Sequence, residues 1–116
     1  MTDSLRNLAL QLDQFAQDRD WRQFHSPKNL ASALVVEAGE LLEHFQWLTE
    51  EQSRTLSPEK RDAVSAEVAD VLLYLIQLAN ALGVDPIAAA QAKLKLNEMK
   101  YPVDLARGNS KKYDEL

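Results

Sequence analysis

Apolar residues recur at helical spacing along almost the whole chain, separated by short polar breaks. Between about Ser4 and Asp18 an apolar stripe repeats every three to four residues, which predicts an amphipathic helix. The next apolar block begins at Ser26-Pro27, a capping serine followed by a first-turn proline. This block predicts a second helix that continues to about Leu48.

Two further helices show the same start and stop signals. Ser57 caps a third helix, and Gly83 is a typical residue to end it. Asp85 caps a fourth helix, which we expect to end before Tyr101, because a residue followed by a proline disfavours helical backbone. No segment shows the alternation of a strand bounded by hairpin signals. The pattern predicts an all-α fold, a four-helix bundle whose second and third helices are central.

The second and third helices are apolar on more than one side. In the third, Val71 and Leu75 belong to one stripe, while Leu72 and Ile76 point to other sides. A chain of 116 residues cannot cover a helix on every side with its own elements. We therefore expect the chain to form a homo-oligomer through these second faces.

Two pairs of acids, each three residues apart, occur on these apolar stripes. Glu37 lies in the stripe of the second helix and Glu67 in that of the third, and Glu40 and Asp70 lie one step round on the same edge. An acid on a core-facing stripe costs several kcal/mol unless it is paired, protonated or bound to a cation. The two helices hold few bases, and none of these lies on the stripes.

The residues alone leave two interpretations of these acids open. One is structural burial beside arginine or lysine. The other is a metal site, in which four facing carboxylates with oxygen donors favour Mg²⁺, with Mn²⁺ as a possible substitute, over Zn²⁺. Di-iron bundles need Glu-x-x-His, but His44 follows Glu40 by four residues, so iron oxidation chemistry is disfavoured. Mg²⁺ acting on a phosphate ester is the alternative.

Composition narrows the possible functions. A chain of 116 residues with 46% hydrophobic and 27% charged residues is typical of one folded domain. The absence of cysteine excludes disulfides, thiolate metal sites and cysteine nucleophiles. A net charge of −5 argues against a nucleic-acid polymer as partner. The chain has no apolar run of membrane-spanning length and no apolar stretch at its start, so we expect no membrane partner and a cytoplasmic location.

Charge is unevenly distributed along the chain. Residues 37–70 hold nine acids and three bases, whereas residues 93–116 hold six bases and four acids. This distribution suits a ligand that needs both a cation and neutralised phosphates. Two solvated faces of opposite sign would give the same distribution.

Several motifs, in order, resemble a known family. Residues 37–47, 67–74 and 93–97 resemble the MazG-like all-α nucleotide pyrophosphohydrolases, whose pattern is Glu-x-x-Glu followed by Glu-x-x-Asp. Residues 20–30 and 101–113 look like the dCTP pyrophosphatase branch of that family. The resemblance covers nearly the whole chain.

The resemblance implies hydrolysis of a nucleoside triphosphate, expected to be dCTP or a modified dCTP, to the monophosphate and pyrophosphate. It implies that the catalytic Mg²⁺ ligands are Glu37, Glu40, Glu67 and Asp70. It implies a base pocket formed or bordered by Trp21, His25, Trp47 and Tyr74. For sugar, metal or phosphates it implies Lys93 and Asn97, together with Tyr101, Arg107, Lys112 and Tyr113 in a flexible tail from about residue 101. It also implies a homo-oligomer, with a tetramer (a dimer of dimers) favoured over a dimer.

Two other functions remain as alternatives. One is a MazG-like hydrolase of other or non-canonical triphosphates, and the other is a non-catalytic oligomerisation or regulatory module whose acids are structural. An enzyme should need Mg²⁺ and lose turnover in Glu40→Gln, whereas a module should bind a protein partner regardless of metal. In the second case Trp21 and Trp47 would be core residues.

Overall fold

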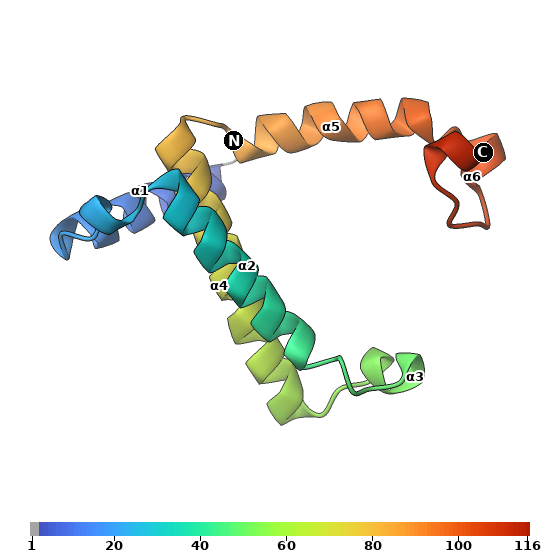
Figure 1. Ribbon diagram of the computed structural model, residues 1–116, viewed down its shortest axis with the longest axis horizontal. Coiled ribbons are helices and arrows are strands. Elements are labelled where there is room, and N and C mark those ends of the chain that lie inside the picture. Colours follow the sequence, from blue (N-terminus) through green and yellow to red (C-terminus); the bar gives the residue numbers. More distant parts are fainter. Residues whose placement is uncertain (1–2) are drawn as a thin grey trace.

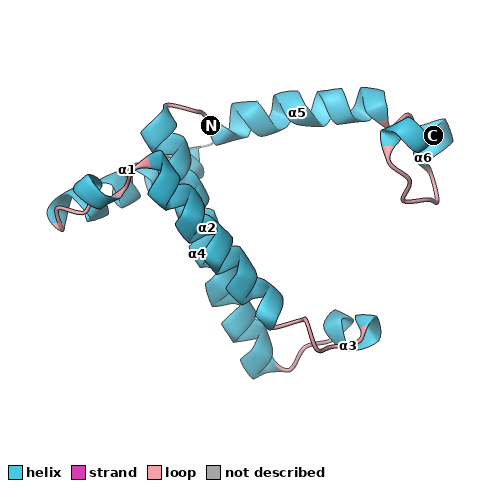
Figure 2. Cartoon of the chain, in the orientation of Figure 1, coloured by secondary structure: helices cyan, strands magenta, loops and turns pink. Residues whose placement is uncertain are grey.

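The structure, a computed structural model, describes residues 3–116, and all regular structure in that range is helical (Figures 1 and 2). Its long helices are α1 (Asp3–Asp18), α2 (Pro27–Glu43), α4 (Pro58–Leu82) and α5 (Pro86–Lys100). Its short helices are α3 (Glu50–Arg54) and α6 (Val103–Ala106), with 3-10 turns η1 (Arg22–Phe24) and η2 (Tyr113–Glu115). The prediction of an all-α fold is confirmed, and the four expected helices are the four long ones.

Side-chain caps begin three of the long helices where the sequence predicted them. Ser26, Ser57 and Asp85 each accept a hydrogen bond from a backbone N–H in the first turn of the following helix. Gly83 ends α4 with a φ of 67°, a left-handed conformation that other residues adopt only at a cost. These local signals explain why α4 and α5 begin and end as expected.

The second helix is shorter than the sequence analysis predicted. α2 ends at Glu43 rather than near Leu48, and the backbone N–H groups of residues 44 and 45 donate to carbonyls three residues back, at 3.2 and 2.8 Å. Thr49 and Gln52 then form a reciprocal capping box, with hydrogen bonds of 2.9 and 3.1 Å, that begins α3. Thr49 itself is extended, with φ −72° and ψ 164°, so α2 and α3 cannot form one continuous helix.

The centre of the molecule is the pair of α2 and α4, which lie side by side along most of their length (Figure 1). α1 packs against the C-terminal part of α4, where Asn80 Nδ2 donates to the Ala9 carbonyl at 3.2 Å. The core at this junction contains Ala9, Leu12 and Ile76, with Leu5, Leu8 and Leu73 packed against them. The second and third predicted helices are therefore central, as expected.

One chain leaves much of its apolar surface uncovered. α5 extends away from the α2–α4 pair after a bend of 99° (Figure 1). The accessible surface is 8973 Å², whereas a compact monomer of 13.1 kDa exposes about 6,400 Å². The radius of gyration is 17.6 Å, compared with about 13 Å for a compact chain of this length. Exposed large apolar residues include Val35, Leu42, Val68, Leu75, Leu94 and Met99.

Within the described residues, no single helix has both the length and the apolarity to cross a membrane. Taken together, the helices α4 and α5, which are bent by 99° relative to each other, are long and apolar enough by length and composition alone.

Candidate functional site

Three of the predicted carboxylates meet between α2 and α4. One carboxylate oxygen from each of Glu37, Glu67 and Asp70 lies within 4.8 Å of the other two. Glu67 and Asp70 are three residues apart on α4, so they share a face, and the packing of α2 along α4 brings Glu37 to it. We call Glu37, Glu67 and Asp70 the acidic cluster.

Glu40 lies beside this cluster without belonging to the group of three. Its carboxyl group comes within hydrogen-bonding reach of Glu37. Proton sharing with Glu40 and then with Glu67, together with burial, raises the pKa of Glu37 to about 7. All four predicted acids are therefore close in space, and Glu37 changes charge near neutral pH.

Buried carboxylate oxygens in the cluster have no donor. Glu37 Oε2 and Glu67 Oε2 are buried and accept no hydrogen bond from any described residue. The ion pairs found in the described chain lie elsewhere, between Arg22 and Asp13 at 2.6 Å and between Arg54 and Glu51 at 3.0 Å. Burial beside basic partners, the structural interpretation of these acids, is therefore not what residues 3–116 show. An all-oxygen site with unsatisfied buried oxygens instead fits a hard divalent cation.

An aromatic pocket of about 400 Å³ adjoins the cluster, and Asp70 belongs to both. Its walls come from α1, the connector after α1, and α4. The Trp21 ring meets Phe15 edge to face, with centroids 5.6 Å apart. Tyr74 is half-buried in the same pocket. The lining residues are Leu8, Gln11, Leu12, Phe15, Trp21, Asp70, Leu73, Tyr74 and Gln77.

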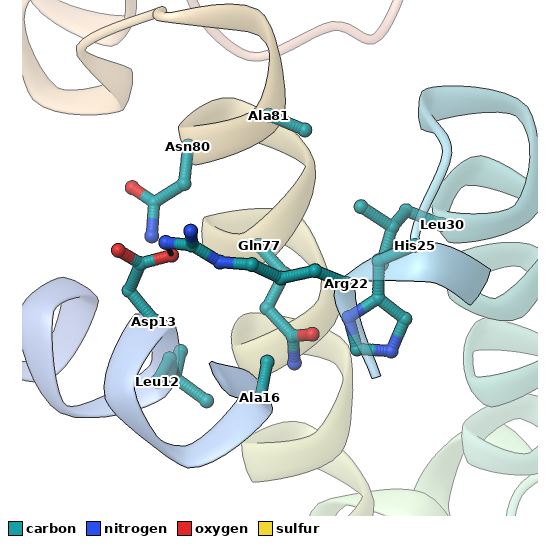
Figure 3. A pocket seen from close by; sticks show the side chains of 9 residues that line it. All are labelled: Leu12, Asp13, Ala16, Arg22, His25, Leu30, Gln77, Asn80 and Ala81. Carbon is teal, nitrogen blue, oxygen red and sulfur yellow. Dashed lines mark ion pairs between the residues drawn. The ribbon is translucent and has the colours of Figure 1, made fainter. Parts of the chain in front are cut away.

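A second pocket, of about 280 Å³, lies next to the aromatic pocket and shares Leu12 and Gln77 with it (Figure 3). His25 lines this neighbouring pocket rather than the aromatic one, although its ring meets Trp21 edge to face at 6.2 Å. The ion pair between Arg22 and Asp13 lies at the same place (Figure 3). The structure thus brings Trp21 and Tyr74 to a pocket that adjoins the acidic cluster. It places His25 in the neighbouring pocket, in contact with Trp21.

The remaining predicted residues lie away from both pockets. Trp47 follows the end of α2, is 87% exposed, and lines neither pocket. Because α2 ends before Trp47, a single chain does not bring this side chain to the aromatic pocket. The others lie on α5 or beyond it: Lys93, Asn97, Tyr101, Arg107, Lys112 and Tyr113. Beyond α5, the Tyr101 and Tyr113 rings meet edge to face at 6.4 Å.

Sequence analysis missed Gln77, which lines both pockets. The signal was present, because Gln77 follows Asp70 by seven residues and Tyr74 by three, which places all three on one face of α4. Leu12 and Phe15 belong to the apolar stripe of the first helix, and this stripe also forms a wall of the aromatic pocket.

The chain is similar to several known proteins in sequence and in fold. The model of the MazG-like family matches residues 33–116. The dCTP pyrophosphatase 1 proteins of Homo sapiens and Mus musculus are 48% and 47% identical to the chain over 105 residues, with 89% of this chain and 62% of each relative covered. The crystal structure of a pyrophosphatase from Archaeoglobus fulgidus matches with a TM-score of 0.82 and 36% identity, covering 88% of this chain and 95% of that one. The chain thus spans less than two thirds of the length of the curated relatives it matches.

Proposed function

The chain belongs to the MazG-like family, and on that premise we propose that it is a nucleoside triphosphate pyrophosphohydrolase that converts dCTP, or a modified dCTP, and water to dCMP and pyrophosphate. Such an activity would clear unwanted nucleotides from the nucleotide pool. The observation that carries the proposal is that the acidic cluster adjoins the aromatic pocket, with Asp70 in both.

The four acids are the proposed ligands of Mg²⁺, with Mn²⁺ as a possible substitute. The buried oxygens of Glu37 and Glu67 that lack a donor support this assignment, as does the all-oxygen donor set. When bound, Mg²⁺ neutralises phosphate oxygens and lowers the pKa of a water molecule. The contribution of the chain is to hold the carboxylates together, and the Glu37 carboxyl, with a pKa of about 7, can hold or release a proton at neutral pH.

The position of the pocket favours cleavage between the α and β phosphorus atoms. The aromatic pocket begins at the acidic cluster and continues along α4 past Tyr74. With a base in this pocket, the α phosphate is the phosphate closest to the acids, because it is the one attached to the sugar. Attack of water at that phosphorus releases pyrophosphate intact, whereas attack at the γ position would release orthophosphate.

The aromatic pocket offers flat surfaces for a base. Two different elements supply them: Trp21 belongs to the connector that follows α1, and Tyr74 belongs to α4. A base stacked on one aromatic ring gains about 1–3 kcal/mol. The His25 ring meets Trp21 edge to face at 6.2 Å and supports the orientation of the indole.

A second copy of the chain is the proposed source of the remaining substrate contacts. The chain exposes about 2,600 Å² more than a compact monomer would, well above the roughly 800 Å² per partner of a standard interface. We propose a homo-tetramer, a dimer of dimers, in which α5 and the residues after it lie against another copy. The proposed contacts across copies are Trp47, Lys93, Asn97, Tyr101, Arg107, Lys112 and Tyr113.

Mixed oligomers test this sharing of the site. Glu67→Gln removes a ligand from the acidic cluster, and Lys93→Ala removes a proposed phosphate contact on α5. If the two groups meet across copies, a refolded mixture of the two variants contains some complete sites and regains part of the activity that each variant lacks alone. Mixed oligomers with no recovered activity would show that α5 does not contribute to another copy's site.

The function itself is tested with a panel of nucleoside triphosphates and Mg²⁺, with pyrophosphate and orthophosphate measured separately. We expect pyrophosphate as the primary product, fastest from dCTP, and no turnover without a divalent cation or in Glu67→Gln. Glu59→Gln is the matched control, because Glu59 is an exposed acid in the first turn of α4 outside the cluster. Orthophosphate as the primary product, or no hydrolysis of any triphosphate, would refute the proposal, and the latter result would favour a non-catalytic module.

A further inference from the structure

Gln77 on α4 has a buried polar atom without a partner, between the two pockets. Its side chain extends from α4 toward the wall that Ala16 and His25 help to form (Figure 3). Gln77 Oε1 is buried and accepts no hydrogen bond from a described donor. The amide of Asn80, one turn further along α4, does find a partner, in the Ala9 carbonyl. A buried amide oxygen left unsatisfied is costly, so its presence in a pocket wall indicates a donor on a ligand.

Gln77 is also at a suitable distance from the acidic cluster. It lies about 20° of helical arc from Asp70, and seven residues of α-helix separate the two by about 10 Å. Tyr74 lies between them on the same face, and all three line the aromatic pocket. A nucleotide with its phosphates at the acidic cluster and its base against Trp21 and Tyr74 would therefore direct the far edge of the base toward Gln77.

We propose that Gln77 determines the base preference, with its Oε1 accepting a hydrogen bond from the exocyclic amino group of cytosine. This inference rests on the proposed function. Cytosine presents an amino donor beside a ring-nitrogen acceptor, and the glutamine amide presents the complementary oxygen and NH₂ group. Uracil presents a carbonyl oxygen in place of the amino group, so two acceptors would face each other.

Binding of nucleoside monophosphates tests this proposal without turnover. With Mg²⁺ present, calorimetry would compare dCMP, dUMP and the 2-pyrimidinone deoxynucleotide, which lacks any group at position 4. The unmodified protein should bind dCMP about tenfold to a hundredfold more tightly than either of the others. Gln77→Met, which keeps length but loses both polar groups, should bind all three with similar affinity. Gln17→Met, a change at an exposed glutamine of α1, should keep the preference.

The outcomes separate this inference from the proposed function. Equal binding of dCMP and dUMP by the unmodified protein would overturn it, because an amide that rotates freely would serve both bases. An unchanged preference in Gln77→Met would also overturn it. The comparison of dCMP with the 2-pyrimidinone nucleotide needs no substitution, so equal binding of these two would overturn the proposal even if Gln77→Met does not fold. A selective protein that hydrolyses no triphosphate would support the role of Gln77 and refute the enzymatic function.

Discussion

With a divalent cation at the acidic cluster, as proposed, Glu37 should make metal binding depend on pH in a way that can be measured without substrate. Glu40, then Glu67, and burial raise its pKa to about 7 from an ordinary value of 4.5. A divalent cation binds the ionised carboxylate, so it must displace the Glu37 proton. With a pKa of about 7, Glu37 is about one-tenth ionised at pH 6 and about nine-tenths ionised at pH 8. The apparent affinity for Mg²⁺ should therefore rise about tenfold over this range.

Calorimetric titration of the protein with Mg²⁺, or spin-resonance titration with Mn²⁺, measures this affinity at pH 6, 7 and 8. Buffers with different heats of ionisation also give the number of protons released, which should approach one per ion at pH 6. Glu37→Gln has no proton to displace at this position, so it should bind more weakly and with little dependence on pH. Glu59→Gln should retain the profile of the unmodified protein. Tight binding that does not change between pH 6 and pH 8 would refute the reasoning.

The raised pKa of Glu37 also determines the direction in which the stability of the fold changes with pH. The folded state holds the Glu37 proton more tightly than the unfolded chain, so this stabilisation is fully present below about pH 4.5 and is lost as the pH rises through about 7. Without metal, the melting temperature of the unmodified protein should therefore fall relative to that of Glu37→Gln as the pH rises. Saturating Mg²⁺ should oppose this loss, because it binds the ionised form.

Three further predictions follow from the site and the exposed surface. Glu67→Gln should keep the apo fold but lose the stabilisation by Mg²⁺ and nucleotide in a thermal shift assay, which is about 2.7 kcal/mol at a hundredfold excess over Kd; an apo variant that unfolds would make the acid structural. Trp47→Ala should raise KM for dCTP by about tenfold to a hundredfold, and an unchanged base preference in both Trp47→Ala and Trp21→Ala would exclude a stacking role. Light scattering should give a molar mass of two or four times 13.1 kDa. Leu75→Glu, at an apolar position that is 43% exposed, should reduce this molar mass. A monomeric unmodified protein would contradict the proposed oligomer.

The long helices were predictable from the sequence because each is determined locally. Ser57, Asp85 and Gly83 act within one turn of their own helix, so the bounds of α4 and α5 follow from nearby residues. The end of α2 was not predicted, because apolar residues continue past it and only the capping box from Thr49 to Gln52 requires the chain to leave the helix. That box has a recognisable sequence pattern, Thr-x-x-Gln, which could have located α3.

The acids were predictable and the pockets were not, for a related reason. Glu37 and Glu67 each stand out within one helix, as charges on an apolar stripe. The pockets depend on how α1 and the connector cross α4, which no local pattern specifies. For this reason His25, adjacent in sequence to the Trp21 segment, lies in the neighbouring pocket, while Gln77, distant in sequence, contributes to both.

α4 provides a physical link between the metal-binding and base-binding halves of the proposed site. Glu67, Asp70, Tyr74 and Gln77 fall within about 80° of arc on one face of this helix and span about 15 Å along its axis. A continuous helix holds such distances far more firmly than loops would, so the spacing between the acids and the base-facing amide is set by backbone hydrogen bonds rather than by side-chain packing. Helix α2 supplies Glu37 and Glu40, and α1 supplies the apolar wall of the aromatic pocket. The order of residues along one helix is therefore more informative about the proposed substrate than the acids alone: carboxylates, then an aromatic ring, then an amide correspond to phosphates, a base plane and a base edge.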